Sequence, residues 1–540
     1  MLALVFLLAK FPGSRQFGPM KWLRSVTVSW ALLAGMAGVF EGRALGAGKA
    51  EHVVMIVWDG MRPDFISPQY TPTLYDLALK GVYFKNHHSV FVTSTEVNGA
   101  ALATGDYPNR HGIFANRLYW SDMNWLDSSA TESLDVIRRG DALTAGHYIA
   151  VPTVTELLQQ AGVSTVVAGT KPVAILLDRF QRRTLPAAQE SVLLYAGHTI
   201  PSSASAQAVK VNDKEFPAAA TPNKSRDAWT TKALTDAFWK KGVPKFSVLW
   251  LSEPDASQHG SGPGSDSALA GIESSDQCLA AVLKTLEEKK VLDKTDLFIV
   301  SDHAFSTVQR GVDLAETLKK ARFKAASRFD DPEPGNVLIV GLGAAAAFYV
   351  IDRDEDVHRR LVQFLQGTDF AGVIFSRLPM PGTFPLAQVR LDTAKAAPDI
   401  VISMRWNADR NEFGAPGMVI ADGGKKGTGT HSSLSRFDLH NILVTAGPDF
   451  RQGMINELPS ANPDLAPTIL WILGAPPASM DGRVLTEALV AGDKVSDKPE
   501  HKTVEADAEV GLRRWHQYLT FTTLGPQIYF DEGNGESSAK

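Results

Sequence analysis

The chain has 540 residues, of which 44% are hydrophobic and 21% charged, as in ordinary folded proteins. This length suffices for one large α/β domain with insertions or for two domains. The formal net charge of −5, without a strongly basic block, argues against nucleic acid as a stable partner. Cys278 is the only cysteine, which excludes internal disulfides and thiolate zinc sites.

The first residues have the pattern of a secretory signal. A short basic stretch beginning at Met20 precedes the apolar run SVTVSWALLAGMAGVF, and small residues suitable for a peptidase follow. The apolar run is too short to span a membrane. We therefore expect residues 1–47 to form an N-terminal extension and signal peptide, with translation starting at Met20. The mature protein is then periplasmic or secreted and has no membrane span.

Strand and helix patterns alternate through the next part of the chain. The strand at 53–58 is followed by the helical pattern TPTLYDLALKGV. Three further helix–strand pairs follow: VPTVTELLQQAGV with STVVAG, RDAWTTKALTDAFWKKGV with KFSVLWL, and SDQCLAAVLKTLEEKKVL with TDLFIVSD. This alternation predicts an α/β fold with a mostly parallel central sheet and helices on both faces. Right-handed crossovers then place the carboxyl ends of these strands at one rim.

The pattern changes between about residues 310 and 420, where short strands surround the helical segment DEDVHRRLVQFLQ. We expect an α+β insertion at 310–420 that caps the rim, between two parts of the core at 48–309 and 421–534. Residues 196–225, rich in Ala, Ser and Pro, predict a surface loop. The polar end of the chain, 535–540, predicts a disordered tail.

Aspartate and histidine residues gather where the predicted strands end. Six residues share this placement, five after strands and one in a Gly-rich loop: Asp59, Asp255, His259, Asp302, His303 and His431. Each alone is explained equally well as a turn, cap or solvated loop residue. Together they predict a metal site, and six ligands with a nucleophile oxygen fit two divalent ions about 4 Å apart. Such ligands suit zinc, and also manganese or cobalt.

A candidate nucleophile lies in the segment SVFVTSTEVNGAALATG. A strand-like run leads into Thr93, Ser94 and Thr95, and an Ala-rich helix follows. A hydroxyl at a helix N-terminus beside a metal ion can lose its proton and attack phosphorus or sulfur. Each hydroxyl also serves as an ordinary N-cap, so the residues alone leave the choice open. The neighbouring pair His87 and His88 shows no metal-ligand spacing.

The sequence resembles the alkaline phosphatase superfamily, and within it the type I phosphodiesterase/nucleotide pyrophosphatase family. The resemblance extends from about Val53 to Leu485. Its motifs occur in the family's order: VWDGMRPD, TPTLYDLALKGV, ATGDYPNRHGIFAN, LSEPDASQHG, VSDHAFS, HSSLSRFDLHNILVTAGPDF and LAPTILWILGAPPASMDGRVL. It implies an alkaline phosphatase-like fold and a secreted two-zinc hydrolase that cleaves phosphodiester or pyrophosphate bonds of small molecules.

The resemblance also implies roles for single residues. It assigns one zinc ion to Asp255, His259 and His431, and the other to Asp59, Asp302, His303 and Thr95. It selects Thr95 as the nucleophile and Asn116 as a hydrogen-bond donor to a phosphoryl oxygen. The implied reaction has two steps, in which a phosphothreonine forms and water then hydrolyses it with overall retention of configuration.

One departure from the family bears on the substrate. Nucleotide-cleaving members have an aromatic residue and a proline after the nucleophile, whereas Glu96 and Val97 stand here. Without that aromatic residue the resemblance does not extend to base stacking or to a preference for nucleotides. Glu96 either repels a dianionic monoester or faces solvent. The alternatives are a phosphomonoesterase or phosphonate hydrolase on the same scaffold, or an envelope phospho-headgroup transferase. A sulfatase fits less well, because TSTEV lacks a formylglycine motif. The sequence leaves the natural substrate and the oligomeric state open.

Overall fold

The computed structural model describes residues 48–178, 185–392, 396–476 and 478–540. The expected signal peptide, with its start at Met20, lies outside these residues.

A nine-stranded sheet forms the centre of the fold. Its strands, in spatial order, are β22 (Met454–Asn456), β2 (Val82–Phe84), β21 (Leu443–Ala446), β10 (Thr295–Val300), β1 (His52–Trp58), β9 (Phe246–Leu251), β6 (Thr165–Gly169), β7 (Val192–Tyr195) and β8 (His198–Ile200). The middle strands are parallel, whereas β21 and β8 run antiparallel to their neighbours. The expected mostly parallel α/β sheet is confirmed.

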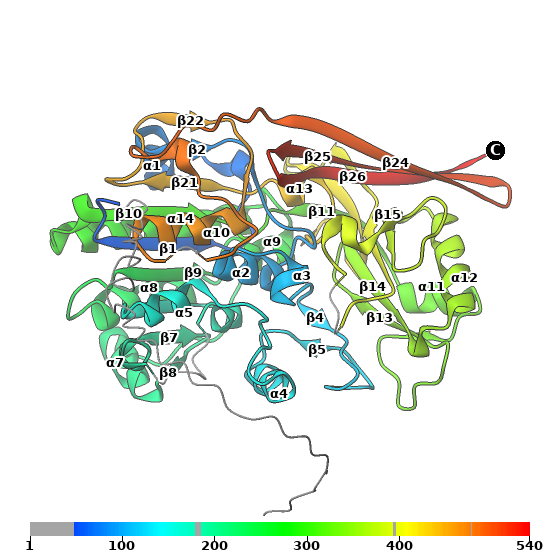
Figure 1. Ribbon diagram of the computed structural model, residues 1–540, viewed down its shortest axis with the longest axis horizontal. Helices are drawn as coiled ribbons and strands as arrows, with labels where there is room; N and C mark the ends of the chain where they lie inside the picture. Colours follow the sequence, from blue (N-terminus) through cyan, green and yellow to red (C-terminus); the bar gives the residue numbers. More distant parts are fainter. Residues whose placement is uncertain (1–47, 179–184, 393–395, 477) are drawn as a thin grey trace, which may run out of the picture. The chain divides into compact units, whose positions relative to one another are not determined.

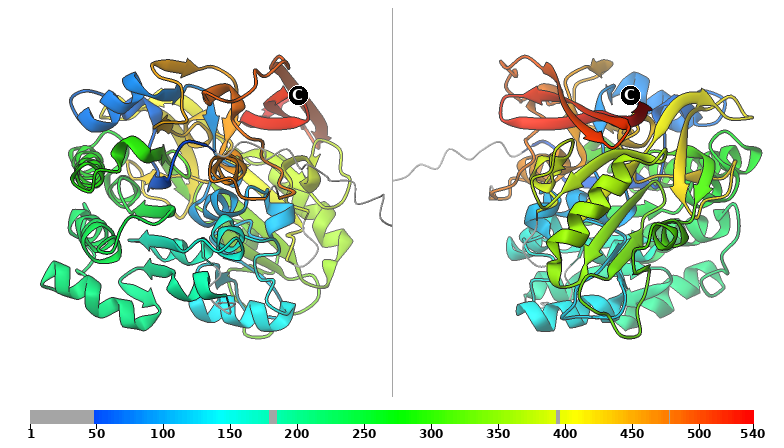
Figure 2. Two further views of the ribbon diagram at one scale, coloured as in Figure 1. Left: turned by 60° about the vertical axis from the view of Figure 1, so that its left-hand side comes forward. Right: turned by 90° about the vertical axis from the view of Figure 1, so that its right-hand side faces the viewer.

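Helices cover both faces of this sheet (Figures 1 and 2). On one face α2 (Thr95–Thr104), α5 (Val154–Gln160) and α14 (Leu465–Ile472) pack on inward residues such as Met55 and Val57. On the other face α1 (Pro72–Lys80), α8 (Lys224–Lys232) and α10 (Asp266–Glu288) pack on Ile56 and Trp58. Because both faces are covered, residues 53–58 of β1 have 0% exposure, which explains their continuous apolar run.

A second group of sheets contains much of the 310–420 segment. A six-stranded sheet has the order β12 (Ala325–Ala326), β13 (Val337–Gly341), β14 (Ala345–Val350), β17 (Ile400–Met404), β15 (Ala371–Ser376) and β16 (Phe384–Pro385). Helices α11 (Leu314–Lys320) and α12 (Glu355–Gln366) pack on one of its faces (Figure 2, right). A four-stranded sheet has the order β18 (Trp406–Arg410), β19 (Pro416–Asp422), β11 (Ser306–Val312) and β20 (Gly429–Thr430).

The C-terminal sheet consists of β24 (Glu500–Val510), β25 (Arg513–Leu524) and β26 (Gln527–Ala539) and contacts β15 and α13 (Arg436–Leu439) (Figure 1). The expected disordered tail at 535–540 is therefore wrong, because β26 continues to Ala539 and pairs with β25 along its length. The polar sequence of this segment does not indicate a strand. Backbone pairing with β25 and hydrogen bonds from Arg513 to Ser537 stabilise it.

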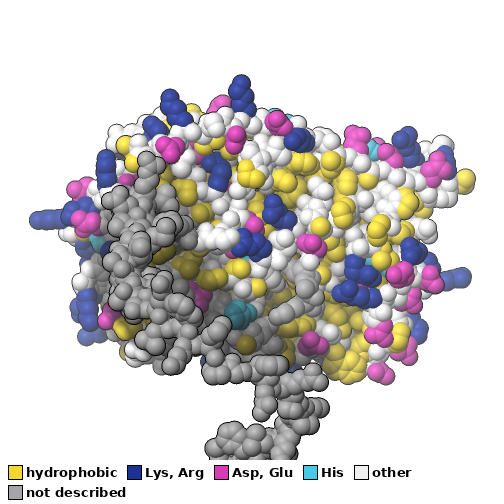
Figure 3. Space-filling view, viewed as in Figure 1, with side chains coloured by type: hydrophobic (Ala, Val, Ile, Leu, Met, Phe, Trp, Pro, Cys, Tyr) yellow, Lys and Arg dark blue, Asp and Glu magenta, His cyan; other side chains and the backbone are white. Residues whose placement is uncertain are grey.

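Shorter elements complete the fold. They are β3 (His87–His88), α3 (Pro108–His111), β4 (Arg117–Leu118), β5 (Ser129–Ala130), α4 (Leu134–Thr144), α6 (Pro186–Glu190), α7 (Ser205–Asn212), α9 (Asp255–Ser261) and β23 (Ser460–Ala461). The segment 196–225, expected as a surface loop, contains the strand β8 and the helix α7. Helix α7 is held against the core, where Ala208 belongs to the same hydrophobic cluster as Trp229. On the face in Figure 3, acidic and basic side chains are interspersed.

Asp296 is an acidic residue inside the core strand β10. Its side chain is fully buried, Oδ1 accepts a hydrogen bond from the Asp449 amide at 3.2 Å, and Oδ2 has no hydrogen-bond partner among the described residues. Burial, and then the neighbouring Asp449 carboxylate, raise the pKa of Asp296 to about 8. This carboxyl therefore stays protonated in the folded protein over a range where it ionises in the unfolded chain.

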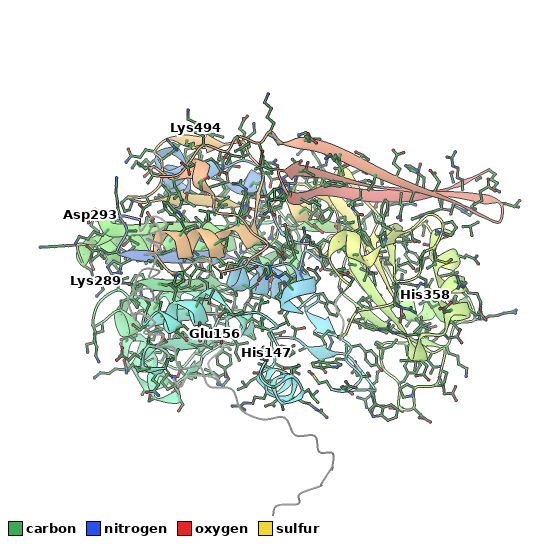
Figure 4. All side chains as sticks on the ribbon, viewed as in Figure 1. His147, Glu156, Lys289, Asp293, His358 and Lys494 are labelled. Carbon is green, nitrogen blue, oxygen red and sulfur yellow. The ribbon has the colours of Figure 1, made fainter. Side chains whose placement is uncertain are left out.

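We predict that Asp296 makes stability fall as the pH rises. Between about pH 4 and pH 8 the folded state holds a proton that the unfolded state has lost, so this group's contribution has a slope of up to about −1.4 kcal/mol per pH unit. Asp296→Asn removes that contribution and flattens the dependence of the unfolding free energy on pH. Urea unfolding across this range measures it, with Asp293→Asn at an exposed position (Figure 4) as the control. Equal slopes in wild type and Asp296→Asn would contradict the prediction.

Candidate metal centre

The structure brings all six predicted ligands to one rim of the central sheet. Asp59 directly follows β1, Asp302 and His303 follow β10, Asp255 begins α9 after β9, and His431 follows β20. His259 lies one turn after Asp255 on the same helix, so both side chains share a face. The parallel strands β1, β9 and β10 place five of these residues together because their carboxyl ends meet at the same edge, and His431 joins them from β20 of the four-stranded sheet.

The six side chains form two adjacent groups. Asp59, Asp302 and His303 form one, and Asp255, His259 and His431 form the other; within each group the nearest ligand atoms lie within 4.8 Å of one another. This is the division that the resemblance implies. The groups touch where the rings of His303 and His431 stack, with centroids 3.8 Å apart.

The three imidazoles present the same nitrogen to the centre. Each Nδ1 lies beside a backbone carbonyl: His259 with Gly429 at 3.3 Å, His303 with Ala304 at 3.0 Å and His431 with Thr93 at 2.8 Å. Nδ1 then donates, and Nε2 keeps the lone pair that a metal ion requires. Burial lowers the pKa of both His303 and His431, which keeps these two rings neutral.

The carboxylates face these nitrogens with unpaired oxygens. Oδ1 of Asp59, Oδ1 of Asp255 and Oδ2 of Asp302 are buried and accept no hydrogen bond within the described part of the chain. Asp255 Oδ1 lies 3.3 Å from His259 Nε2 and 3.7 Å from His431 Nε2. His303 Nε2 lies 3.6 Å from Asp59 Oδ1 and 3.4 Å from Asp302 Oδ2.

Electrostatics favour cations at this point. Burial, followed by the charge of Asp302, raises the pKa of Asp59 to about 8, and burial raises that of Asp302 to about 7. Buried carboxylates this close cannot all ionise unless positive charge compensates them. Unpaired oxygens beside oriented Nε2 atoms fit two divalent ions of the zinc type.

Lys171 is a member of the site that the sequence analysis missed. Its Nζ lies 2.9 Å from Asp59 Oδ2 and 2.9 Å from Asp255 Oδ2, between the two groups. Burial disfavours its charge, but Asp255 and Asp59 outweigh burial and hold its pKa above the usual range. The signal was available, because Lys171 follows the buried strand β6 at the same rim. Lysine is not a metal-ligand residue type, so the pattern of Asp and His residues does not include it.

The three candidate hydroxyls differ in their hydrogen-bond partners. Thr95 is the first residue of α2, and its Oγ1 lies 3.2 Å from His303 Nε2. Thr93 Oγ1 instead donates to the Ser433 carbonyl at 3.0 Å. Ser94 is the N-cap, and its buried Oγ has no hydrogen-bond partner among the described residues. Of these three hydroxyls, only that of Thr95 has a hydrogen bond to one of the six rim residues.

Glu96 lies inside the protein beside Asn116. Its side chain is 6% exposed, and its amide donates to Asn116 Oδ1 at 3.2 Å, which leaves the Asn116 amide group free to donate elsewhere. Burial, and then Glu132, raise the pKa of Glu96 well above its usual range. The solvent-facing alternative is therefore wrong.

We predict that Lys171→Met destabilises the metal-free protein by about 3 kcal/mol, because it leaves two buried carboxylates without their shared cation. Bound zinc supplies that charge, so the loss shrinks in the zinc-loaded protein. Urea unfolding with and without zinc measures both values. Lys85→Met, which removes an exposed lysine paired with Glu457 at 3.1 Å, is the control and costs less than about 1 kcal/mol. An equal loss in both metal states would contradict this role of Lys171.

Comparison with known proteins identifies the family of this site. The model for type I phosphodiesterase/nucleotide pyrophosphatase matches residues 53–410. The chain is 23% identical to bis(5'-adenosyl)-triphosphatase of Xenopus laevis, over 47% of this chain and 47% of that protein. It is 21% identical to venom phosphodiesterase of Macrovipera lebetinus, over 74% of this chain and 40% of that enzyme. The chain is 23% identical to family member 7 of the ectonucleotide pyrophosphatase/phosphodiesterases from Rattus norvegicus, over 83% of this chain and 89% of that protein.

Solved structures show the same fold. Murine ectonucleotide pyrophosphatase/phosphodiesterase 5 superposes with a TM-score of 0.56 at 18% identity, covering 81% of this chain and 99% of that one. The chain thus spans about half of the first two curated relatives and most of the third. Because the family model matches well over half of the chain, this protein belongs to the type I phosphodiesterase/nucleotide pyrophosphatase family.

Proposed function

We propose that the protein is a secreted two-zinc hydrolase that cleaves phosphodiester or pyrophosphate bonds of small molecules through a phosphothreonine at Thr95. The observation that carries this proposal is the position of the Thr95 hydroxyl, 3.2 Å from His303 Nε2 and beside two Asp/His groups. Membership of the family supports the type of bond cleaved.

The two groups supply the ligands. Asp255, His259 and His431 would hold one zinc ion, and Asp59, Asp302, His303 and Thr95 the other. When bound, the ions supply positive charge that favours ionisation of a hydroxyl and stabilises the charge on phosphoryl oxygens. The unpaired carboxylate oxygens and oriented imidazoles support this assignment.

The residues of the chain perform the remaining tasks. Thr95 Oγ1, at the N-terminus of a ten-residue helix, loses its proton and bonds to phosphorus while the bond to the leaving oxygen breaks. Water then breaks the Thr95–phosphorus bond, so the threonine regains its hydroxyl and the product keeps the new oxygen. Asn116 donates a hydrogen bond to a phosphoryl oxygen, and its Oδ1 is held by the Glu96 amide.

A relative supports the role of threonine. Murine ectonucleotide pyrophosphatase/phosphodiesterase 5 was solved with AMP as a threonine-to-alanine variant described as inactive. For the present chain, Glu96 stands where nucleotide-cleaving members carry an aromatic residue, and its side chain is buried. We therefore do not extend nucleotide preference to this protein.

Two expectations from the sequence stay part of the proposal. Residues 1–47 carry the signal for export to the periplasm or the medium, and residues 310–420 form an insertion that caps the site. Among the described residues, none of the helices has the length and apolarity needed to cross a bilayer. N-terminal sequencing of the exported protein tests the first expectation, with a start near Gly48 expected and residues before Met20 contradicting it.

We predict that Thr95→Ala lowers hydrolysis of bis-p-nitrophenyl phosphate by at least about a thousandfold, because the neighbouring hydroxyls of Thr93 and Ser94 make no hydrogen bond to the six ligand residues. Zinc-loaded protein is assayed in parallel with p-nitrophenyl phosphate, and the diester is expected to be cleaved faster. Ser94→Ala is the matched control and keeps its activity. Full activity of Thr95→Ala would rule out the phosphothreonine route, and faster monoester cleavage would place the enzyme with the phosphatases.

Asn116→Asp tests the hydrogen bond to the phosphoryl group. This nearly isosteric change removes the amide donor, so we expect kcat for the diester to fall by about a hundredfold at unchanged zinc content. Steady-state kinetics together with metal analysis distinguish this effect from loss of a ligand. An unchanged kcat would show that Asn116 does not contact the reacting phosphate.

A further inference from the structure

A second cluster of ligand-type side chains lies outside the rim. His88, His440 and Asp531 bring their ligand atoms within 4.8 Å of one another. The three residues come from separate parts of the chain: His88 from β3, His440 from the residue after α13, and Asp531 from β26 of the C-terminal sheet. The cluster therefore joins the core to that sheet.

The backbone builds this cluster by two irregular pairings. His88 and His440 form an isolated antiparallel bridge, and their ring centroids lie 4.4 Å apart. In β26, Glu532 pairs with Thr520 and Phe530 with Phe521, so Asp531 is the extra residue of a β-bulge. A bulge turns a side chain out of the regular alternation. Here it places Asp531 Oδ1 3.1 Å from His88 Nε2.

The donors and acceptors resemble those of the three histidines at the rim. His88 Nδ1 lies 3.1 Å from the Ser460 carbonyl, so it donates there and Nε2 points at the Asp531 carboxylate. Asp531 Oδ2 in turn accepts a hydrogen bond from Thr522 Oγ1 at 2.8 Å. Outer hydrogen bonds of this kind orient metal ligands. An imidazole lone pair facing a carboxylate is repulsive unless a proton or a cation lies between them.

Protonation of His88 alone does not explain why the His440 imidazole lies beside this pair. Protonated His88 would pair with Asp531, but none of the described residues hydrogen-bonds the His440 imidazole. A metal ion instead satisfies all three side chains. The 3.1 Å between His88 and Asp531 is close to the separation of about 3.3 Å between two ligands of a tetrahedral zinc ion.

We propose that His88, His440 and Asp531 bind a structural zinc ion, or a similar divalent transition ion, that fastens the C-terminal sheet to the core. His501 of β24 supports the cluster indirectly, because its Nδ1 lies 2.8 Å from Thr522 Oγ1, the hydroxyl that donates to Asp531 Oδ2. This site is separate from the rim and does not depend on the proposed function.

The test is the zinc content of the full-length protein. Zinc is added in excess to the wild type, to His440→Gln and to Asp531→Asn, and unbound zinc is removed by gel filtration. Elemental mass spectrometry then gives the number of zinc ions per chain. We expect each variant to hold one zinc ion fewer per chain than wild type, while cleavage of bis-p-nitrophenyl phosphate changes less than about twofold. The control is His516→Gln, because His516 also pairs with an aspartate of this sheet, Asp507 at 3.1 Å, but is exposed. It keeps the full zinc content.

A second measurement shows what the ion does. Hydrogen exchange of β26 is expected to be faster in both variants than in wild type and in His516→Gln, with the central strands β1 and β10 unchanged. If His440→Gln does not fold, Asp531→Asn alone decides, because Asp531 lies at the surface end of the cluster. Equal zinc content in wild type and the folded variants would overturn the proposal.

Discussion

The structure depends on compensating the charge of three buried carboxylates. Asp59, Asp255 and Asp302 follow strands whose residues are fully buried, and each has one buried carboxylate oxygen that accepts no hydrogen bond from the described residues. Burial raises the pKa of Asp59 to about 8 and that of Asp302 to about 7, whereas for Asp255 burial is outweighed by Lys171 and the neighbouring histidines, which hold the pKa well below its usual range. The Nε2 atoms of the histidines and the Lys171 ammonium surround the same oxygens. The centre is thus built to hold positive charge.

The fold connects this requirement to chemistry. Parallel strands bring the carboxylates to one rim, and the helix that follows Ser94 begins at that rim with Thr95. The hydroxyl therefore meets both the helix N-terminus and the ligand groups. The same positive charge serves stability and chemistry. It compensates the buried aspartates, and it would also assist an attack on phosphorus. The C-terminal sheet is tied to the same core through β3 by His88 and Asp531.

The central sheet and the rim were predictable from the sequence because local patterns encode them. Apolar runs that end in Asp or His mark buried strands and their carboxyl ends, and Asp59 and Asp302 were found in this way. The choice among Thr93, Ser94 and Thr95 required three-dimensional structure, since each is a plausible cap. Lys171 was missed because it is not a metal-ligand type, and β26 because its polar end carries no hydrophobic alternation. The His88–Asp531 contact joins residues 443 positions apart, which no local pattern reveals.

Anomalous diffraction at the zinc edge from crystals of the zinc-loaded protein tests the central claim most directly. We expect one anomalous peak within Asp59, Asp302 and His303, and another within Asp255, His259 and His431. Lys171 Nζ should then have moved away from at least one of its two carboxylates, since the ions take over its role. Absence of a peak from either group, with Lys171 still bridging Asp59 and Asp255, would contradict the two-ion centre.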